Sequence, residues 1–318
     1  MSSAFLTTDL SEQITPLFKA NTKNPKRLYE ILKGVSLKKK DLGHMSISRN
    51  GISVKTGATN QFQAVTFIPR EFFYHYTFNG TEPLEIVITL SDLYGILGTV
   101  QDGYDSSQDQ PLDEEFISLQ GYSSEGQQQL FTDDGGNEPI MDNNFGFNYE
   151  ASFEYEKEGA TFNVKLFDNT VTSTVEIIPV LQEPLHDIPE PSNRVILFKI
   201  LCYELKRILR DCIKIGSKFR LNGYKHEKFV LRFSSRNEYQ FVEHFIRCDA
   251  FHHHKIDDDF QFTYPKHHVQ PLLSLLINKK ENIEVAIYTN GLMKMKFCPG
   301  DVQNSYINYM MTTMVEDE

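Results

Sequence analysis

One histidine- and aspartate-rich stretch carries the side chains best suited to binding a metal ion. The stretch "CDAFHHHKIDDD" contains Cys248, the consecutive histidines His252, His253 and His254, and the carboxylates Asp257–Asp259. Metal-dependent nucleases need clustered carboxylates that hold hard cations near the scissile phosphate. Neighbouring residues of a strand point to opposite faces, so consecutive ligands do not converge on one ion. We interpret the stretch as a polar loop and expect no metal, no cofactor and no catalytic residue.

The remaining composition excludes other chemistry. No Walker loop, G-x-S-x-G or H-E-x-x-H motif occurs, which leaves ATPase, hydrolase and metalloprotease functions without support. The four cysteines are scattered, the first residues "MSSAFLTTDLSEQ" lack the features of a secretory signal, and no apolar run approaches the roughly 18–20 residues of a membrane span. We expect a soluble intracellular protein with reduced thiols.

Positive charge gathers on two predicted helices although the chain has a net charge of −11. One helix spans about Pro25–Val35, and the other lies in "CYELKRILRDCIKIG", residues 202–216. Both place cations opposite an apolar stripe: Lys26, Arg27 and Lys33, followed by Lys38–Lys40, on the first, and Lys206, Arg207, Arg210 and Lys214 on the second. Such a face is usually only solvated, but its repetition predicts a strip that contacts phosphates without reading sequence.

The acidity resides mostly in one segment. Between Gln101 and Glu150 there are 12 acidic residues and no Lys, Arg or His, which leaves 43 − 12 = 31 acidic against 32 basic residues elsewhere. The segment is rich in Gln, Ser, Asn and Gly, and is too polar to form a core. We predict a disordered insertion over about 101–148; binding of a basic partner, or mimicry of nucleic acid, is the alternative.

Strands and turns dominate the elements that must position these residues. Four Asn-Gly pairs lie between alternating apolar runs and predict hairpins: Asn50-Gly51, Asn79-Gly80, Asn222-Gly223 and Asn290-Gly291. Two further helices are predicted, one over Ser91–Gly98 with Ser91 as N-cap and one around Lys266–Lys279, which Pro271 restricts to its later turns. Their apolar stripes are Leu93, Ile96 and Leu97, and Val269, Leu272, Leu273 and Leu276.

The order of elements repeats once along the chain. Each half runs strand, helix, hairpin, further strands, helix and final strands, and the halves open on Leu17-Phe18-Lys19 and Leu197-Phe198-Lys199. Between them, the proline-rich residues 181–193 form an extended connector. We therefore predict an α+β protein with an N-terminal domain over 1–180, a connector over 181–193 and a C-terminal domain over 194–318.

This plan resembles a DNA sliding clamp of the PCNA superfamily. Residues 27–78 and "LEIVITLSDLYGILG", residues 84–98, are similar to the start of the Rad-one type subunit of the checkpoint clamp, the heterotrimer called nine-one-one. The ending "VAIYTNGLMKMKF…YINYMMTTMVEDE" resembles that family's last strands. The acidic insertion is longer than the family usually has there.

The resemblance implies two tandem clamp domains, with antiparallel sheets outside and two helices per domain on the inner face of a ring. DNA would be threaded through the hole. The hole would be lined by cations of the helices: Lys26, Arg27, Lys33, Lys206, Arg207, Arg210 and Lys214, together with Lys266. Edge strands near Thr172–Val180 and Glu238–Arg247 would close the ring by β-augmentation. Partner peptides would dock on the connector, at Leu181, Pro184, Leu185 and Ile188.

The implied partners are two paralogous clamp subunits, double-stranded DNA bound without sequence specificity, an ATP-dependent clamp loader, repair enzymes and checkpoint proteins, in the nucleus. A Rad-nine type subunit is disfavoured because the chain stops at Glu318 without that type's long phosphorylated tail. The Hus-one type and a homotrimeric PCNA-type replication clamp remain alternatives. A 3′→5′ exonuclease activity, with which the family has been credited, is a further alternative that the spacing of carboxylates does not favour.

Overall fold

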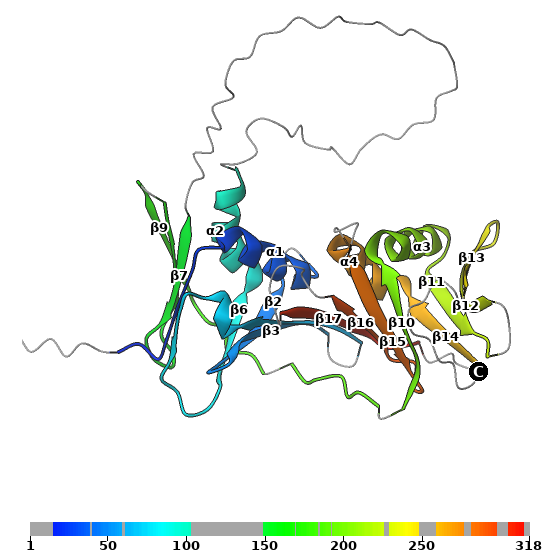
Figure 1. Cartoon of the computed structure of the whole chain (residues 1–318), viewed down its shortest axis with the longest axis horizontal. Coiled ribbons are helices and arrows are strands. Elements are labelled where there is room, and N and C mark those ends of the chain that lie inside the picture. The colour runs from blue at the N-terminus through cyan, green and yellow to red at the C-terminus, as the bar shows by residue number, and fades with distance from the viewer. Residues whose placement is uncertain are drawn as a thin grey trace, which may run out of the picture.

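The computed structural model describes residues 15–38, 40–58, 61–102, 149–168, 170–183, 185–191, 193–225, 229–247, 259–276, 281–297 and 305–314. The expected acidic insertion therefore lies outside the described residues from position 103 onward. The described chain is α+β, as predicted, with antiparallel sheets and four α-helices that lie along one side of them (Figure 1).

The first half contains nine strands, two α-helices and a short 3₁₀ helix. In chain order these are β1 (Phe18–Thr22), α1 (Pro25–Val35), β2 (Leu42–Ser48), β3 (Gly51–Ala58), β4 (Phe62–Pro69), η1 (Arg70–Phe72), β5 (His75–Phe78), β6 (Leu84–Thr89), α2 (Leu90–Asp102), β7 (Glu150–Tyr155), β8 (Phe162–Phe167) and β9 (Thr172–Ile177). The second half contains β10 (Arg194–Leu201), α3 (Cys202–Ile215), β11 (Lys218–Gly223), β12 (Phe229–Arg236), β13 (Phe241–Arg247), β14 (Phe260–Pro265), α4 (Lys266–Leu275), β15 (Asn282–Tyr288), β16 (Met293–Phe297) and β17 (Tyr306–Met311).

Strand pairing repeats between the halves, which supports the predicted duplication. β1 pairs with β7, β7 with β8 and β8 with β9, just as β10 pairs with β15, β15 with β16 and β16 with β17. β2 pairs with β3 and β6, and β3 with β4, as β11 pairs with β12 and β14, and β12 with β13. Only β5, beside β1, has no counterpart among the described strands.

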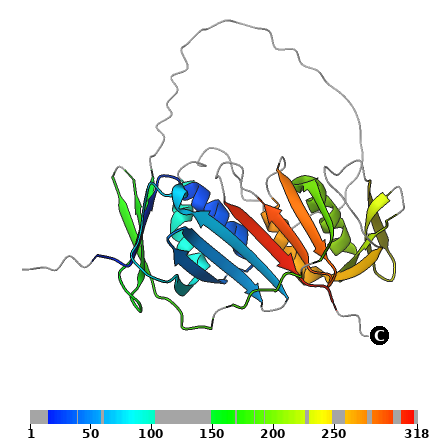
Figure 2. The same cartoon turned by 60° about the horizontal axis from the view of Figure 1, so that its bottom comes forward.

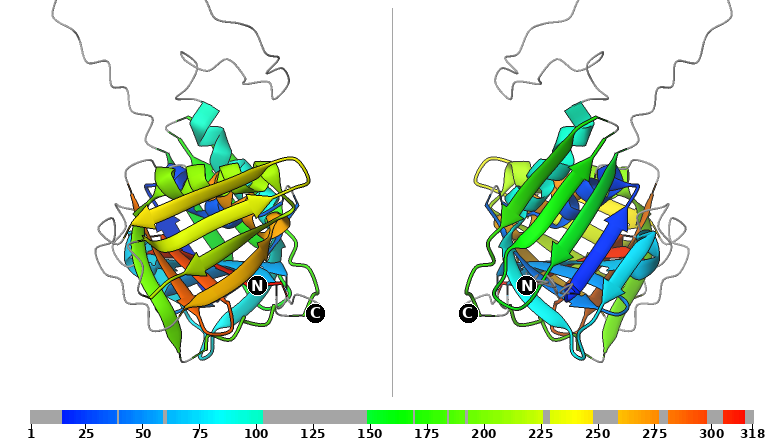
Figure 3. Two further views of the ribbon diagram at one scale, coloured as in Figure 1. Left: turned by 90° about the vertical axis from the view of Figure 1, so that its right-hand side faces the viewer. Right: turned by 90° about the vertical axis from the view of Figure 1, so that its left-hand side faces the viewer.

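The two halves share one sheet. β17 pairs antiparallel with β4, so an eight-stranded sheet of order β10-β15-β16-β17-β4-β3-β2-β6 crosses the middle of the molecule (Figure 2). A five-stranded sheet, β5-β1-β7-β8-β9, closes one end, and a four-stranded sheet, β13-β12-β11-β14, closes the other (Figure 3). The division into domains at 181–193 stays a prediction, because the shared sheet continues across it.

The helices pack on the sheets through the predicted apolar stripes. α1 buries Leu28, Ile31, Leu32 and Val35, and α3 buries Leu205, Ile208, Leu209, Cys212 and Ile213, each set recurring every three to four residues. α2 begins at Leu90, so the N-cap position falls on Thr89, Ser91 lies inside the first turn, and the predicted N-cap is wrong by two positions. α4 begins at Lys266, before Pro271, which corrects the prediction that this proline excludes the early turns.

Two of the four predicted Asn-Gly turns are confirmed. Gly51 follows the β2–β3 turn at a φ of 147°, and Gly291 lies in the β15–β16 turn at a φ of 77°, in the region that favours glycine. Asn79-Gly80 joins β5 to β6, which do not pair, because each pairs instead with a strand from another part of the chain. Asn222-Gly223 ends β11, where Asn222 donates to Gln261 on β14, so the β11–β12 turn comes later.

Two of the predicted reduced thiols lie in the core. Cys202 and Cys212 are free and buried on α3, and burial raises their pKa values to about 11 and about 12. Both thiols are therefore protonated and unreactive at neutral pH. None of the described helices is long and apolar enough to cross a membrane.

Candidate nucleic-acid interface

The basic helix of the second half presents an uncompensated row of cations. Arg207, Arg210 and Lys214 on α3 are exposed and Lys206 is half-buried, because the opposite stripe of the helix is inserted between the sheets. None of the ion pairs between described residues involves these four side chains. The row of positive charge on α3 therefore stays available to an anionic partner.

The acidic residues of α3 are directed elsewhere. Asp211 lies 3.4 Å from His244 on β13, and Glu204 accepts a hydrogen bond from the Tyr203 hydroxyl at 3.2 Å. Both carboxylates therefore have partners at the margins of the row.

The cations of α1 are more constrained than those of α3. Lys26 and Lys33 are exposed, and the Lys33 ammonium lies 5.2 Å from the ring centroid of Tyr29. Arg27 is half-buried and donates to Glu30 at 2.7 Å, an i,i+3 pair on the helix surface. Arg27 is therefore partly neutralised, and α1 carries less free positive charge than α3.

Lys266 lies next to the end of α3. It is the first residue of α4, its backbone N–H donates to the Ser217 carbonyl at 2.8 Å, and its side chain is half-buried. The neighbouring His268 is buried, and desolvation together with His267 lowers its pKa to about 4. His268 is therefore neutral near pH 7 and adds no charge to this face.

All the predicted cations thus belong to helices on one side of the sheets, visible above the shared sheet in Figure 1. The helices paired with α1 and α3 contribute little charge, since α2 contains no basic residue and α4 contains Lys266 and two histidines. The face supplies point charges without a glycine-rich cradle, and so suits the repeating phosphates of a nucleic acid rather than one bound nucleotide.

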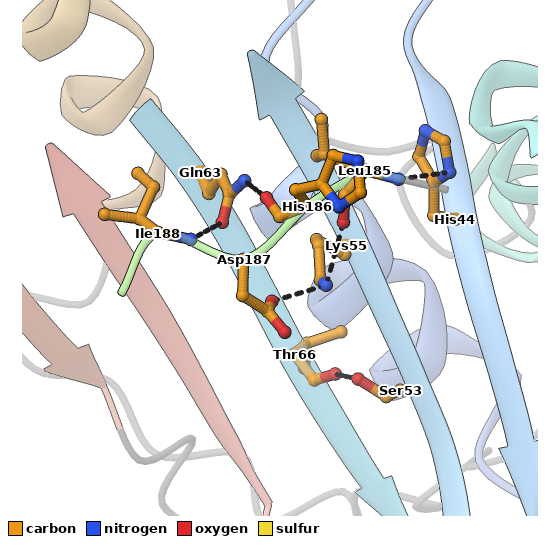
Figure 4. A network of polar contacts seen from close by, with 9 residues as sticks. All are labelled: His44, Ser53, Lys55, Gln63, Thr66, Leu185, His186, Asp187 and Ile188. Atoms are coloured by element: carbon orange, nitrogen blue, oxygen red, sulfur yellow. Dashed lines mark hydrogen bonds and ion pairs between the residues drawn. The ribbon is translucent and has the colours of Figure 1, made fainter. Parts of the chain in front are cut away.

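The connector crosses the opposite side of the shared sheet, where side chains of β2, β3 and β4 bind it (Figure 4). Gln63 on β4 is fully buried; its side-chain amide donates to the His186 carbonyl and accepts from the Ile188 N–H at 3.1 Å. The Lys55 ammonium on β3 bonds both the Leu185 carbonyl, at 3.2 Å, and Asp187, at 2.5 Å. The segment 185–188 is therefore attached to the outer face of the sheet by side chains of β3 and β4.

A histidine completes this attachment. The Leu185 N–H donates to His44 Nδ1 at 3.3 Å, which requires that nitrogen to be unprotonated. Burial, and then the nearby Lys55 charge, lower the pKa of His44. His44 is thus held in the neutral form that this hydrogen bond needs.

The connector residues expected to dock partner peptides differ in their exposure. Leu181 is fully exposed and Leu185 is half-buried, whereas Pro184 lies outside the described residues. Ile188 is buried against Leu292 and Met310, so the chain already covers its side chain, and its assignment to a partner-facing surface needs correction. Beside Leu181 and Leu185 lies a groove of about 1000 Å³ against the outer face of β2, β3 and β6.

The two predicted edges are end strands of their sheets. β9 ends the five-stranded sheet and β13 ends the four-stranded sheet, at opposite ends of the molecule (Figure 3). Large apolar side chains near them are exposed: Val171 and Ile178 beside β9, and Tyr239, Phe241 and Phe245 at β13. The sequence "EYQFVEHF" signals this, because Tyr239, Phe241 and Phe245 alternate on one side of the strand, and an apolar side that the chain leaves exposed indicates a surface covered by a partner.

The candidate metal-binding stretch is not tested by the structure. Cys248, the three histidines and Asp257–Asp258 lie outside the described residues, and Asp259 accepts a hydrogen bond from the Lys225 N–H at 2.7 Å. Among the residues that the structure does describe, no group of three or more His, Cys, Asp and Glu could hold a metal ion.

Comparison with known proteins agrees with this geometry. A family profile described as "Repair protein Rad1/Rec1/Rad17" matches residues 17–294. The chain belongs to this family of repair proteins. A search of curated proteins finds no match.

Solved structures of sliding clamps share the fold of this Rad1/Rec1/Rad17 family member. PCNA from Thermococcus kodakaraensis superimposes with a TM-score of 0.64 at 10% identity, over 93% of this chain and 100% of that chain. Proliferating cellular nuclear antigen from Entamoeba histolytica gives a TM-score of 0.65 at 12% identity, over 95% and 100%. The chain is a clamp-type protein of PCNA-like fold.

Proposed function

We propose that this chain is one subunit of a heterotrimeric DNA sliding clamp that encircles DNA at sites of damage, promotes checkpoint kinase signalling and serves as a platform for repair factors. The observation that carries the proposal is the repeat of strand pairing. β9 is the counterpart of β17, and β13 is the counterpart of β4, the two strands that join the halves of the chain. Repeating that joint between chains links subunits head to tail.

Such a head-to-tail contact is heterologous, and it produces a ring if the rotation closes. The exposed apolar side chains at both ends of the molecule support burial there by a neighbouring chain. In this ring the helices face the hole, and Arg207, Arg210 and Lys214 lie nearest to the threaded DNA. Contacts of this kind position a duplex without reading its bases, which is what a protein that slides requires.

The partners follow from the same proposal. Closing a ring around DNA needs an ATP-dependent loader, since this chain has no nucleotide-binding motif. Repair enzymes and checkpoint proteins dock on the outer face, where Leu181 and the groove beside Leu185 offer apolar surface under an anchored connector. The protein acts in the nucleus and as a scaffold, without catalysis of its own.

Co-expression with two paralogous clamp subunits tests the proposal. We expect one particle with a mass of three subunits, formed only when all three are present, that is retained on circular DNA after loading and lost on linearisation. A chain that remains monomeric in the presence of both subunits, or that alone forms a stable DNA-encircling homotrimer, would refute the heterotrimeric assignment. Nucleotide release by the purified chain that Asp257→Ala abolishes would instead establish the exonuclease.

A further inference from the structure

We propose that the edge strand β13 selects against the chain's own β9, and accepts a strand with an aromatic residue opposite Phe245 and no carboxylate opposite Glu243. This inference rests on the ring proposed above and specifies the chemistry of the neighbour at that edge. It follows from the β17–β4 ladder, which is the joint between the two halves of the chain. The register of that ladder predicts the register in which β9 and β13 of two neighbouring chains would pair.

The counterpart of β9 is found by following the ladders. In the first half, Lys19 pairs with Glu154, Glu154 with Asn163, and Asn163 with Glu176. In the second half the equivalent path runs from Lys199 to Glu284, Lys296 and Asn308. Glu176 on β9 therefore occupies the place of Asn308 on β17.

The counterpart of β13 is found in the same way. Thr89 and Pro265 each end the strand before a helix, and they pair with Leu42 and Lys218, so β2 and β11 align. Two residues further along β2, His44 pairs with Lys55 on β3, and Lys55 pairs with Val65 on β4. Two residues further along β11, Arg220 pairs with Ser234 on β12, and Ser234 pairs with Glu243 on β13. Glu243 on β13 therefore occupies the place of Val65 on β4.

Within the chain, Asn308 lies directly opposite Val65. If two copies of the chain formed the same joint, Glu176 would lie directly opposite Glu243. Like charges directly opposite in an antiparallel pair are destabilising. The Arg232 guanidinium, which bonds Glu243, also lies 5.8 Å from the ring centroid of Phe245 and is already engaged by both groups.

The position two residues along shows a second mismatch. Phe67 on β4 lies opposite Tyr306 on β17, and their rings stack with centroids 6.0 Å apart. Phe245 occupies the place of Phe67, and is 49% exposed. The place of Tyr306, two residues before Glu176, is taken on β9 by Thr174, so a second copy offers no aromatic ring to Phe245.

The two edges of this chain are thus not complementary. β13 presents Phe241 and Phe245 beside an Arg232–Glu243 pair, whereas the same face of β9 presents Thr172, Thr174 and Glu176. A neighbouring strand that pairs with β13 as β17 pairs with β4 needs two changes from β9. It carries an aromatic residue at the position equivalent to Thr174 and a neutral or basic residue at the position equivalent to Glu176. Specificity of this kind works by penalising the wrong partner as well as stabilising the right one.

The test is to convert β9 into such a strand. The full chain is purified alone as wild type, Thr174→Tyr, Glu176→Lys and the double variant, and its mass is measured by sedimentation equilibrium over a concentration series. We expect the wild type to sediment at the 36.8 kDa of one chain. The double variant should self-associate roughly tenfold or more tightly, and each single variant should be intermediate.

Matched variants exclude trivial explanations. Glu158→Lys, in the exposed β7–β8 turn, makes the same change in net charge and should leave the mass unchanged. Adding Phe245→Ala to the double variant should reverse its self-association. Because Thr174 and Glu176 are exposed, the variants at these two positions should unfold at the wild-type urea midpoint when measured at concentrations too low for self-association.

The outcomes separate this inference from the ring itself. If the double variant stays monomeric while the wild type still assembles with two paralogous subunits, the ring stands and the edge-selection proposal is wrong. Self-association that survives Phe245→Ala refutes it as well. If the wild type assembles with no paralogous subunit, the proposed function fails and the inference fails with it.

Discussion

The ring of Tyr306 on β17 stacks on the ring of Phe67 on β4, with the two ring centroids 6.0 Å apart and an interplanar angle of 26°. The two residues lie opposite each other in the only described ladder that connects the first half of the chain to the second. Together with the backbone ladder, this aromatic pair binds the halves into one sheet.

Removing either ring of this pair should lower the free energy of unfolding, and the effects of the two substitutions should not be additive. Phe67→Ala and Tyr306→Ala, alone and together, form a double-mutant cycle, and stacked aromatic pairs contribute about 0.5–1.5 kcal/mol beyond the area they bury. We expect a coupling of that size in the free energy of unfolding, measured in urea. The cycle of Phe67→Ala with Tyr29→Ala, on α1, serves as the control and should show no coupling.

Gln63→Leu should release the connector. The change leaves the Ile188 N–H and the His186 carbonyl without the side-chain amide that bonds them, at a cost of about 1–3 kcal/mol for buried polar groups. Hydrogen exchange should show lost protection of the Ile188 amide, with β4 itself unchanged. Lys55→Met removes the hydrogen bond to the Leu185 carbonyl and the pair with the exposed Asp187. Both lie nearer to solvent than Gln63, so this variant should cost less; an equal or larger effect would show that the charge, not the amide, anchors the segment.

His268 should make the stability of the chain sensitive to mild acid. Its pKa is about 4 in the folded chain against an ordinary value of 6.5, so the unfolded chain binds the proton more readily. Stability is therefore retained above pH 6.5, and is lost as the pH falls from 6.5 towards 4, by on the order of 3 kcal/mol.

Urea titrations from pH 7.5 to pH 4 measure this loss. His268→Gln cannot titrate in that range, so its unfolding free energy should fall less steeply than that of the wild type below pH 6.5. Above pH 7 the two curves should run parallel. Identical slopes in the acid range would show that burial of His268 does not govern the pH dependence.

Reversing the charge of the α3 row should weaken DNA binding by the assembled clamp. The triple variant Arg207→Glu, Arg210→Glu and Lys214→Glu removes up to three phosphate contacts, so the slope of log K against log salt should become less negative by up to about 3 units. Titration of duplex DNA at several salt concentrations measures this change.

The matched control reverses three lysines that lie away from the helix face. Lys165 and Lys218 alternate with buried residues that face the core, so they lie on the side away from the helices, opposite uncharged residues, and Lys157 lies in the exposed β7–β8 turn. Their reversal to Glu changes net charge equally and should leave the salt slope unchanged. An equal effect of both triple variants would mean that overall charge, not the helix face, governs binding.

Much of the fold was predictable because the apolar periodicity has a local cause. The stripes of α1 and α3, such as Leu28 and Ile31, recur at helical spacing and are buried as expected. Turns were less predictable: Asn79-Gly80 has the sequence of a hairpin, but β5 and β6 pair with β1 and β2, and that choice is made by tertiary contacts. Lys55 and Gln63 gave no signal, because an outward-facing polar residue of a strand looks the same whether it meets water or a connector.

In the candidate site, too, features with a local cause were predictable and features set by tertiary contacts were not. The cations of α3 were predictable from spacing alone, but the directions of Glu204 and Asp211 were not, since they depend on Tyr203 and on β13. Ile188 was mistaken for a docking residue because nothing in the connector's sequence distinguishes a side chain that faces a partner from one that faces Leu292 and Met310.

The β17–β4 joint between the halves is reinforced by the connector, and the edge strands β9 and β13 have no such reinforcement among the described residues. β17 and β4 are held by their ladder and also by the connector, through Gln63 and Lys55 on one half and the pairing of Glu190 with Lys294 on the other. β9 and β13 offer only their strands to a neighbour. In the proposed ring, a loader that opens the clamp therefore separates two subunits at a β9–β13 contact. The β17–β4 ladder inside each subunit stays intact, so the ring opens between chains and not within one.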